Sequence, residues 1–300
     1  MTDNPRLYYE VLGCAAALGS ALSWAVGSIL FRKVGEAASP VGMNLGKCIL
    51  GTIYLGIVLL PTGHEAIDTR SLLVLVVSGL LGIALGDTFF FKALVNLGPR
   101  LTVLLGTLGP LMTVAMAMIL FKERLSVFGW AGAILTLAGV NLVLWEDTPS
   151  EVGGKRKWII GVIYALLAAV CMSLGIISAK IGVGESSALE ATFIRILAAG
   201  SGLAVWGCVS RQLGNWLTPF KDPTLLKLIS VAVLVVMFGG FWLSLVALQY
   251  IDVSVATILN STEPLFIVPL VGIVLKEKVT VRGIVGALVA VVGVALVFRG

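Results

Sequence analysis

The stretch GPLMTVAMAMILFKERLSVFGWAGAILTLAGVNLVLW, residues 109–145, occurs twice in this chain in related form. The second copy, EPLFIVPLVGIVLKEKVTVRGIVGALVAVVGVALVFR, occupies residues 263–299, which places it 154 positions later. The copies share a proline, a Lys-Glu pair and three glycines: Pro110 and Pro264, Lys122-Glu123 and Lys276-Glu277, and Gly129, Gly132 and Gly139 with Gly283, Gly286 and Gly293. Such a duplication predicts a chain built from two halves of one design.

The composition places both halves in a membrane. Hydrophobic residues make up 58% of the chain and charged residues only 12%, whereas an ordinary soluble domain carries about a quarter charged residues. Apolar runs of roughly 20 residues, long enough to cross a bilayer as helices, recur throughout. We expect them at residues 11–31, 41–60, 71–95, 101–121, 126–145, 158–179, 188–209, 226–248, 253–275 and 282–298. The chain is therefore predicted to be an all-α membrane protein with ten transmembrane helices and no soluble domain that binds nucleic acid.

The repeat also defines the expected domains. An offset of 148 positions pairs Gly27 with Gly175 and Lys47 with Arg195 in the front part of each half. The boundary falls in a polar segment with proline and paired glycines, so we expect repeats at residues 1–148 and 158–300 with a linker at 149–157. Five spans per half is an odd number, so the second half enters from the opposite side of the membrane. This predicts two inverted five-helix repeats around a central cavity.

Four ionisable residues fall deep inside the expected spans: Lys47, Asp87, Arg195 and Glu263. A charged side chain at such depth is costly and usually faces the bundle interior or a wet cavity, so these four are candidates for solute binding or coupling. The alternative is a buried ion pair that only fixes helix packing, for example Asp87 with Lys47 or with Arg195.

Glu263 is the strongest of these candidates because it directly precedes Pro264, with Pro110 at the matching position of the first half. A proline inside a span removes one backbone hydrogen bond and frees carbonyls to face a cavity, so both prolines are expected to break their helices. A simple packing kink is the other interpretation. Glu263 can stay protonated in an apolar setting or ionise to meet a proton or an ammonium group, and this change could couple solute to access.

Aromatic side chains are expected to line the cavity. Trp24, Phe91 and Trp242 are the candidates, although aromatic residues of any helical bundle also pack or face lipid. Asp87 and Phe91 lie one helical turn apart and so share a face.

Other chemistries lack their residues in this sequence. The four cysteines show no CxxC spacing, and the chain has a single histidine. These residues therefore indicate neither a metal site nor a cofactor. With no set of nucleophile, acid and base near one membrane face, we do not expect an enzyme.

The chain resembles the drug/metabolite transporter superfamily in its ten-helix EamA-type branch. The resemblance rests on the duplicated unit, on Glu263-Pro264 and Pro110 with the charged motifs that follow them, and on GDTFFFKALVNLGPR at residues 86–100. It implies a basket-like bundle in an inner membrane, cytoplasmic termini and export or exchange of small metabolites such as amino acids. The basic residues of the loops, taken alone, favour the opposite orientation.

We therefore expect a secondary transporter of small organic metabolites, amino-acid-like solutes being favoured, that works by alternating access. Its partners would be the solute, protons and the lipid bilayer, and a monomer would suffice. Two alternatives stay open at this point: efflux of lipophilic cations, as in the small multidrug resistance relatives, and a receptor or scaffold that transports nothing.

Overall fold

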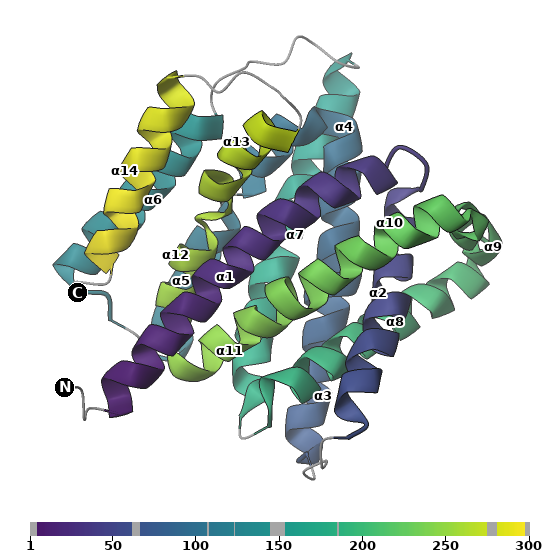
Figure 1. Ribbon diagram of the computed structural model, residues 1–300, viewed down its shortest axis with the longest axis horizontal. Helices are drawn as coiled ribbons and strands as arrows, with labels where there is room; N and C mark the ends of the chain where they lie inside the picture. Colours follow the sequence, from purple (N-terminus) through teal and green to yellow (C-terminus); the bar gives the residue numbers. More distant parts are fainter. Residues whose placement is uncertain are drawn as a thin grey trace.

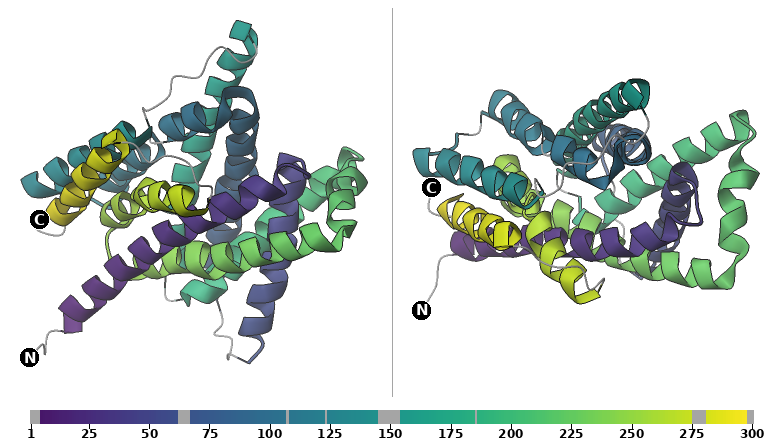
Figure 2. Two further views of the ribbon diagram at one scale, coloured as in Figure 1. Left: turned by 45° about the horizontal axis from the view of Figure 1, so that its top comes forward. Right: turned by 90° about the horizontal axis from the view of Figure 1, so that it is seen from above.

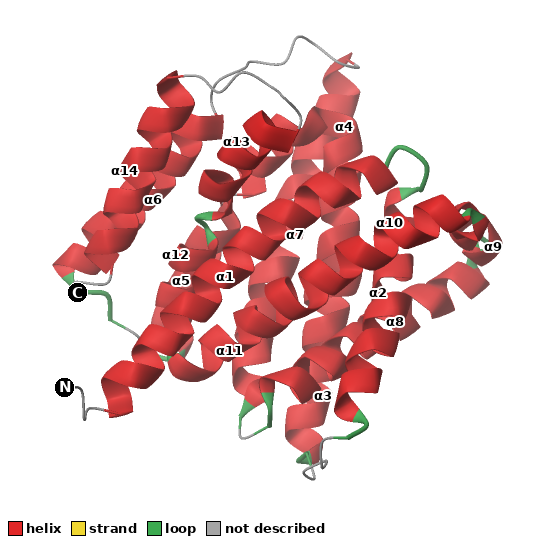
Figure 3. Cartoon of the chain, in the orientation of Figure 1, coloured by secondary structure: helices red, strands yellow, loops and turns green. Residues whose placement is uncertain are grey.

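Helices make up all of the secondary structure in the part of the chain that the computed structural model describes (Figure 3). The described residues are 5–61, 67–106, 108–122, 124–144, 154–184, 186–274 and 281–297. The first half contains α1 (Pro5–Val34), α2 (Pro40–Leu59), α3 (Thr69–Ser78), η1 (Gly79–Gly86), α4 (Asp87–Gly106), α5 (Leu108–Leu120) and α6 (Val127–Leu144). The second half contains α7 (Gly154–Val183), α8 (Ala188–Val209), α9 (Leu213–Leu217), η2 (Thr218–Lys221), α10 (Pro223–Leu234), η3 (Val235–Trp242), α11 (Leu243–Tyr250), α12 (Val253–Asn260), α13 (Glu263–Val274) and α14 (Val281–Val297).

The chain is a multi-pass membrane protein by the length and composition of these helices. Six segments are long and apolar enough to span a bilayer: Tyr8–Phe31, Pro40–Leu59, Thr69–Ala93, Arg156–Val183, Ala188–Val209 and Pro223–Tyr250. Shorter apolar helices cover Leu108–Leu120, Val127–Gly139, Val253–Ile267 and Val281–Gly293. The expectation of exactly ten separate spans stays a prediction.

Equivalent residues begin the second helix of each half. Ser39 accepts a hydrogen bond from the backbone N–H of Gly42, and Pro40 follows at the first helical position. Ser187 and Glu190 form a capping box at the start of α8, each side chain accepting from the other residue's backbone N–H. Capping satisfies N–H groups that the first turn of a helix leaves free. The repeat therefore extends to the signals that start these helices.

Two expected spans differ from the observed helices. We expected one span to end at residue 95 and the next to begin at 101, but α4 continues to Gly106. A proline removes one helical hydrogen bond without forcing the helix to end, and here α4 is held along its course by packing against α7.

The second difference is a break in the expected span 253–275, which divides into α12 and α13 at Ser261 and Thr262. Pro264 clashes with the carbonyl of residue 260 if the helix continues, so a new helix starts with this proline in its first turn. The hydroxyls of Ser261 and Thr262 donate to the carbonyls of Thr257 (2.8 Å) and Leu259 (2.7 Å), which adds to the backbone hydrogen bonds that these carbonyls accept from the same two residues.

The two halves exchange their first helices. α1 packs against the second-half elements α10, η3, α11, α12 and α13, whereas α7 packs against the first-half elements α3, η1, α4 and α5. Figures 1 and 2 show α1 crossing the molecule beside α10 and α11. The pairs α2 with α8 and α6 with α14 join corresponding helices of the two halves (Figure 1). Each half is thus completed by a helix of the other.

The α6–α14 pair depends on reciprocal glycine contacts. A Cβ atom on Gly139 would lie 2.4 Å from the backbone N of Ala290, and one on Gly293 would lie 2.4 Å from the backbone N of Thr136. These neighbours are backbone atoms and cannot rotate away, so both glycines set how closely the helices approach.

We expect Gly139→Ala and Gly293→Ala each to destabilise the protein by about 1–3 kcal/mol, the usual cost of overpacking. Thermal unfolding of the detergent-purified protein measures this effect. Gly214→Ala is the control, because a Cβ there meets nothing within 4 Å. Unchanged melting temperatures for both Gly139→Ala and Gly293→Ala would contradict the observed packing of α6 on α14.

Candidate functional site

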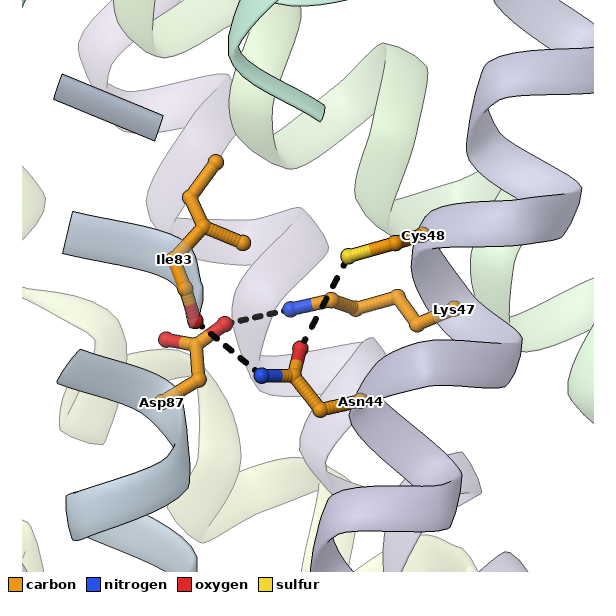
Figure 4. A network of polar contacts seen from close by, with 5 residues as sticks. All are labelled: Asn44, Lys47, Cys48, Ile83 and Asp87. Carbon is orange, nitrogen blue, oxygen red and sulfur yellow. Dashed lines mark hydrogen bonds and ion pairs between the residues drawn. The ribbon is translucent and has the colours of Figure 1, made fainter. Parts of the chain in front are cut away.

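Two charged residues of the first half meet in the interior. Lys47 of α2 forms an ion pair with Asp87, the first residue of α4, and their side chains are only 4% and 14% exposed (Figure 4). One turn earlier on α2, Asn44 Nδ2 donates to the carbonyl of Ile83 at 3.0 Å. Lys47 and Asn44 thus fasten α2 to the point where η1 passes into α4.

The helix changes from π to α type where η1 passes into α4. η1 is a π-helix, and η3 is a second π-helix of eight residues that begins 156 positions later, within the third span of the other half. A switch between α and π hydrogen bonding leaves backbone groups without their usual partner, and such segments occur frequently at functional sites. Side chains serve both: Asn44 binds the Ile83 carbonyl of η1, and Ser20 donates to the Gly240 carbonyl of η3 at 2.9 Å.

Arg195 of α8 brings a second cation from the other half. Its exposure is 6%, and no described residue hydrogen-bonds to its Nε. Glycines of η1 make room for it: a Cβ on Gly79 would lie 2.2 Å from the Arg195 carbonyl oxygen, and one on Gly82 would lie 3.8 Å from Nη2. Asp87 acts on Arg195 electrostatically but pairs with Lys47. We call Lys47, Asp87 and Arg195 the central charge cluster.

Aromatic rings adjoin this cluster. The Nζ of Lys47 lies 5.2 Å from the ring centroid of Phe241, a cation–π distance. Trp24 of α1 packs edge to face on Phe241, with ring centroids 4.8 Å apart. Phe241, which sequence reasoning missed, lies 154 positions after Asp87. The repeat offset was therefore the signal that could have found it.

The other two aromatic candidates are not in this arrangement. Phe91 packs against the apolar core that contains Leu45, Ile196 and Met237. Trp242 packs against a separate apolar core and lies edge to face with Phe238. Of the three aromatic candidates, only Trp24 is connected to the central charge cluster by ring contacts among the described residues.

Glu263 lies apart from the cluster but connects to it through α1. It is the first residue of α13, directly after the helix break, and its Oε1 lies 2.9 Å from Ser28 Oγ. Ser28 is one turn from Trp24 and also lies 2.8 Å from the Trp24 carbonyl oxygen. A string of contacts therefore runs from Asp87 through Lys47, Phe241 and α1 to Glu263.

The matching position in the first half carries no carboxylate. Pro110 lies in the first turn of α5, as Pro264 does in α13. The Gly109 carbonyl in front of it accepts hydrogen bonds from Thr113 Oγ1 (3.0 Å) and from Ser173 Oγ on α7 (2.9 Å). An exchanged helix thus supplies a hydroxyl at both places, to a carbonyl in one half and to a carboxylate in the other.

The described residues contain no group of three or more His, Cys, Asp or Glu side chains close enough to hold a metal ion. No residue set is assigned to a metal.

Two segments of the chain, residues 11–145 and 159–299, match the model of the EamA-like transporter family. The chain belongs to this family. Similar EamA-type proteins include an uncharacterized transporter of Archaeoglobus fulgidus, 24% identical over 93% of this chain and 95% of its own length. The uncharacterized inner membrane transporter YhbE of Escherichia coli is 30% identical over 48% of this chain and 44% of its own.

A solved crystal structure shares the fold of this EamA-type chain. It superposes with a TM-score of 0.75 over 95% of both chains, at 18% sequence identity. The uncharacterized transporter YvbV of Bacillus subtilis, 31% identical over 45% of this chain and 46% of its own, is a further relative in sequence.

Lys47 and Arg195 occupy equivalent positions but differ in their partners, which predicts unequal effects of removing them. Lys47→Met leaves Asp87 buried without a partner and should cost about 3–5 kcal/mol of stability. Arg195→Met removes a buried guanidinium whose Nε has no partner and should cost little or nothing. Unfolding in detergent compares them. Equal losses would mean that Arg195 has a structural partner, contrary to the observed geometry.

Proposed function

We propose that this protein is a secondary transporter that moves small organic solutes, amino-acid-like ones above all, by alternating access. The observation that carries the proposal is the central charge cluster, because two cations and an acid from both halves lie buried where the halves meet. Charges at membrane depth are costly and mark solute or ion pathways. Since one chain supplies both halves, a monomer suffices.

We propose further that the halves are inverted relative to one another around a central cavity and that the protein lies in an inner membrane with cytoplasmic termini. The pairing of corresponding helices, α2 with α8 and α6 with α14, supports a pseudo-twofold relation. Five spans per repeat would reverse the second half in the bilayer.

Labelling from outside the cell tests the inversion. Val127 and Val281 are equivalent first residues of α6 and α14 and are 83% and 76% exposed. Single cysteines at these positions, in a background without the four native cysteines, should react with an impermeant maleimide at one site and not at the other. Equal reaction at both sites would contradict the inverted arrangement.

Glu263 is proposed as the coupling residue, and its hydrogen bond to Ser28 supports this role. Ser28 carries one hydroxyl proton but lies within hydrogen-bond distance of two acceptors, the Trp24 carbonyl and Glu263 Oε1. When Glu263 is ionised, Ser28 donates to it. When Glu263 is protonated, it donates to Ser28, and Ser28 donates to Trp24. Rotation of one hydroxyl therefore satisfies both protonation states.

The same geometry speaks against efflux of lipophilic cations. That function needs an accessible, unpaired acid, but Asp87 pairs with Lys47 in a cluster that carries more positive than negative charge, and Glu263 is hydrogen-bonded to Ser28. For a receptor or scaffold, by contrast, we would expect a cluster in which every charge is paired. Arg195 does not fit that expectation.

Transport in proteoliposomes tests the function. Purified protein is assayed with a panel of amino acids and related metabolites, with and without an imposed pH gradient. Solute movement above that of empty liposomes is expected, and a gradient dependence would indicate coupling to protons. No movement of any solute would contradict the proposed function.

Glu263→Gln keeps the shape and the hydrogen bond to Ser28 but removes the titrating group. In the same assay it should fold normally and lose most transport, or lose the gradient dependence. Ser28→Ala is the companion variant, because it removes the hydroxyl relay while leaving the carboxylate. A wild-type rate and pH profile in Glu263→Gln would make this carboxylate structural.

A further inference from the structure

The central charge cluster is incomplete in its charges. Lys47 and Arg195 are cations and Asp87 is the single acid among them, so the cluster carries one net positive charge. Glu263 does not balance it, since its hydrogen-bond partner is Ser28, and Asp87 is the acid whose charge acts on Arg195. A buried charge without a counterion is disfavoured in a medium of low dielectric constant.

The cation that lacks a counterion is Arg195 and not Lys47. Asp87 is committed to Lys47, which also contacts the Phe241 ring, so this ammonium already has its partners. Arg195 is as deeply buried, yet its Nε meets no hydrogen-bond acceptor among the described residues. An unsatisfied buried donor costs about 1–3 kcal/mol, more when the group is charged. That cost is recovered only when something else binds the guanidinium.

The missing group must present one negative charge to the guanidinium. A guanidinium presents its N–H donors in a planar fork that matches a carboxylate at two points. A single carboxylate matches the one charge of the guanidinium, whereas a phosphate dianion would leave the cluster with one net negative charge. Gly82 of η1 lies beside the guanidinium, where a Cβ would be 3.8 Å from Nη2, so this residue places no side chain over it.

We propose that Arg195 binds the carboxylate of the transported solute and that this ion pair compensates the charge of the buried guanidinium. The assignment rests on the proposed transport function and gives it a substrate class: small organic acids and zwitterions with a free carboxylate, amino acids included. Lys47, the equivalent residue of the first half, serves instead to hold Asp87. The two halves thus place a structural cation and a solute-binding cation at matching positions.

Binding in detergent tests this assignment separately from transport. Thermal unfolding is measured with L-leucine, L-phenylalanine, L-threonine and pyruvate, each beside its primary amide, and with inorganic phosphate. At least one acid should raise the melting temperature, by about 5–10 °C at about 100 times its Kd. Its amide should bind roughly 10- to 100-fold more weakly, because it lacks the charge-assisted contact to Arg195.

Variants locate the contact. Arg195→Gln should abolish the stabilisation by the acid while leaving the melting temperature without ligand unchanged or raised. Arg195→Lys keeps the positive charge but loses the planar set of donors, so it should retain part of the stabilisation by the acid. This variant replaces Arg195→Gln in the test if Arg195→Gln does not fold. Lys92→Gln is the matched control. It removes another cation of the spans, one whose Nζ lies 5.4 Å from the ring centroid of Tyr164 and 5.5 Å from that of Trp206, and it should leave the stabilisation intact.

The outcomes separate the two proposals. Equal binding of acid and amide, full stabilisation of Arg195→Gln, a preference for phosphate, or no stabilisation by any acid would overturn the carboxylate site. If acids bind through Arg195 but no solute moves in proteoliposomes, the site stands and the transport function fails. If solutes move while acid and amide bind alike, the function stands and the site fails.

Discussion

A backbone carbonyl or N–H group without a partner costs several kcal/mol in a hydrocarbon environment, and each irregular point in this bundle meets that constraint with a side chain. Asn44 binds a carbonyl of one π-helix and Ser20 a carbonyl of the other. At the break before α13, the hydroxyls of Ser261 and Thr262 add hydrogen bonds to the carbonyls of the last turn of α12. Most of the candidate functional residues lie beside the π-helices or the helix break. The buried charged residues are therefore found where the regular α-helical hydrogen bonding is interrupted.

The duplication supplies a symmetric scaffold on which unlike chemistry is placed. Equivalent positions carry Lys47 and Arg195, Asp87 and Phe241, and Gly109 and Glu263. Each pair occupies equivalent positions of the repeat and differs in its side chain. If both halves carried Asp87 or both carried Glu263, the interior would hold two similar sites, whereas these two acids have uncharged counterparts and the cations Lys47 and Arg195 differ in their partners. Because the two halves carry different side chains at equivalent positions, the interior holds one asymmetric set of charges and not two equal sites.

Sequence reasoning found what depends on composition and period. The duplicated segments, the apolar helices and the charged residues at depth all follow from spacing and hydrophobicity, and the equivalent caps at Ser39 and Ser187 lie within the same repeat. The sequence did not predict the π-helices, because α- and π-helices of such apolar residues have the same composition and differ in hydrogen bonding alone. The sequence also did not predict which cation pairs with Asp87, since a shift of one or two ångströms between helices decides whether Lys47 or Arg195 reaches it.

The exchange of α1 and α7 changes which parts of the protein can move as units. If each sequence half rocked as a body, α1 would have to slide over α11 and η3, and α7 over α4. Extensive packing makes such sliding costly. The contacts instead group α7 with α3, η1, α4 and α5, and α1 with α10 to α13. These two groups, each built from both halves of the sequence, are the bodies whose separation alternating access would change.

Lys47 connects these bodies, since it pairs with Asp87 in one and lies over Phe241 in the other. The two contacts differ in strength. A cation–π contact contributes about 0.5–2 kcal/mol, whereas breaking a buried ion pair costs about 3–5 kcal/mol. If alternating access separated these bodies, the weaker contact with Phe241 would be the first to break. The ion pair of Lys47 with Asp87 would then persist, and the aromatic face of Phe241 and Trp24 would be the part of the interior that such a movement uncovers.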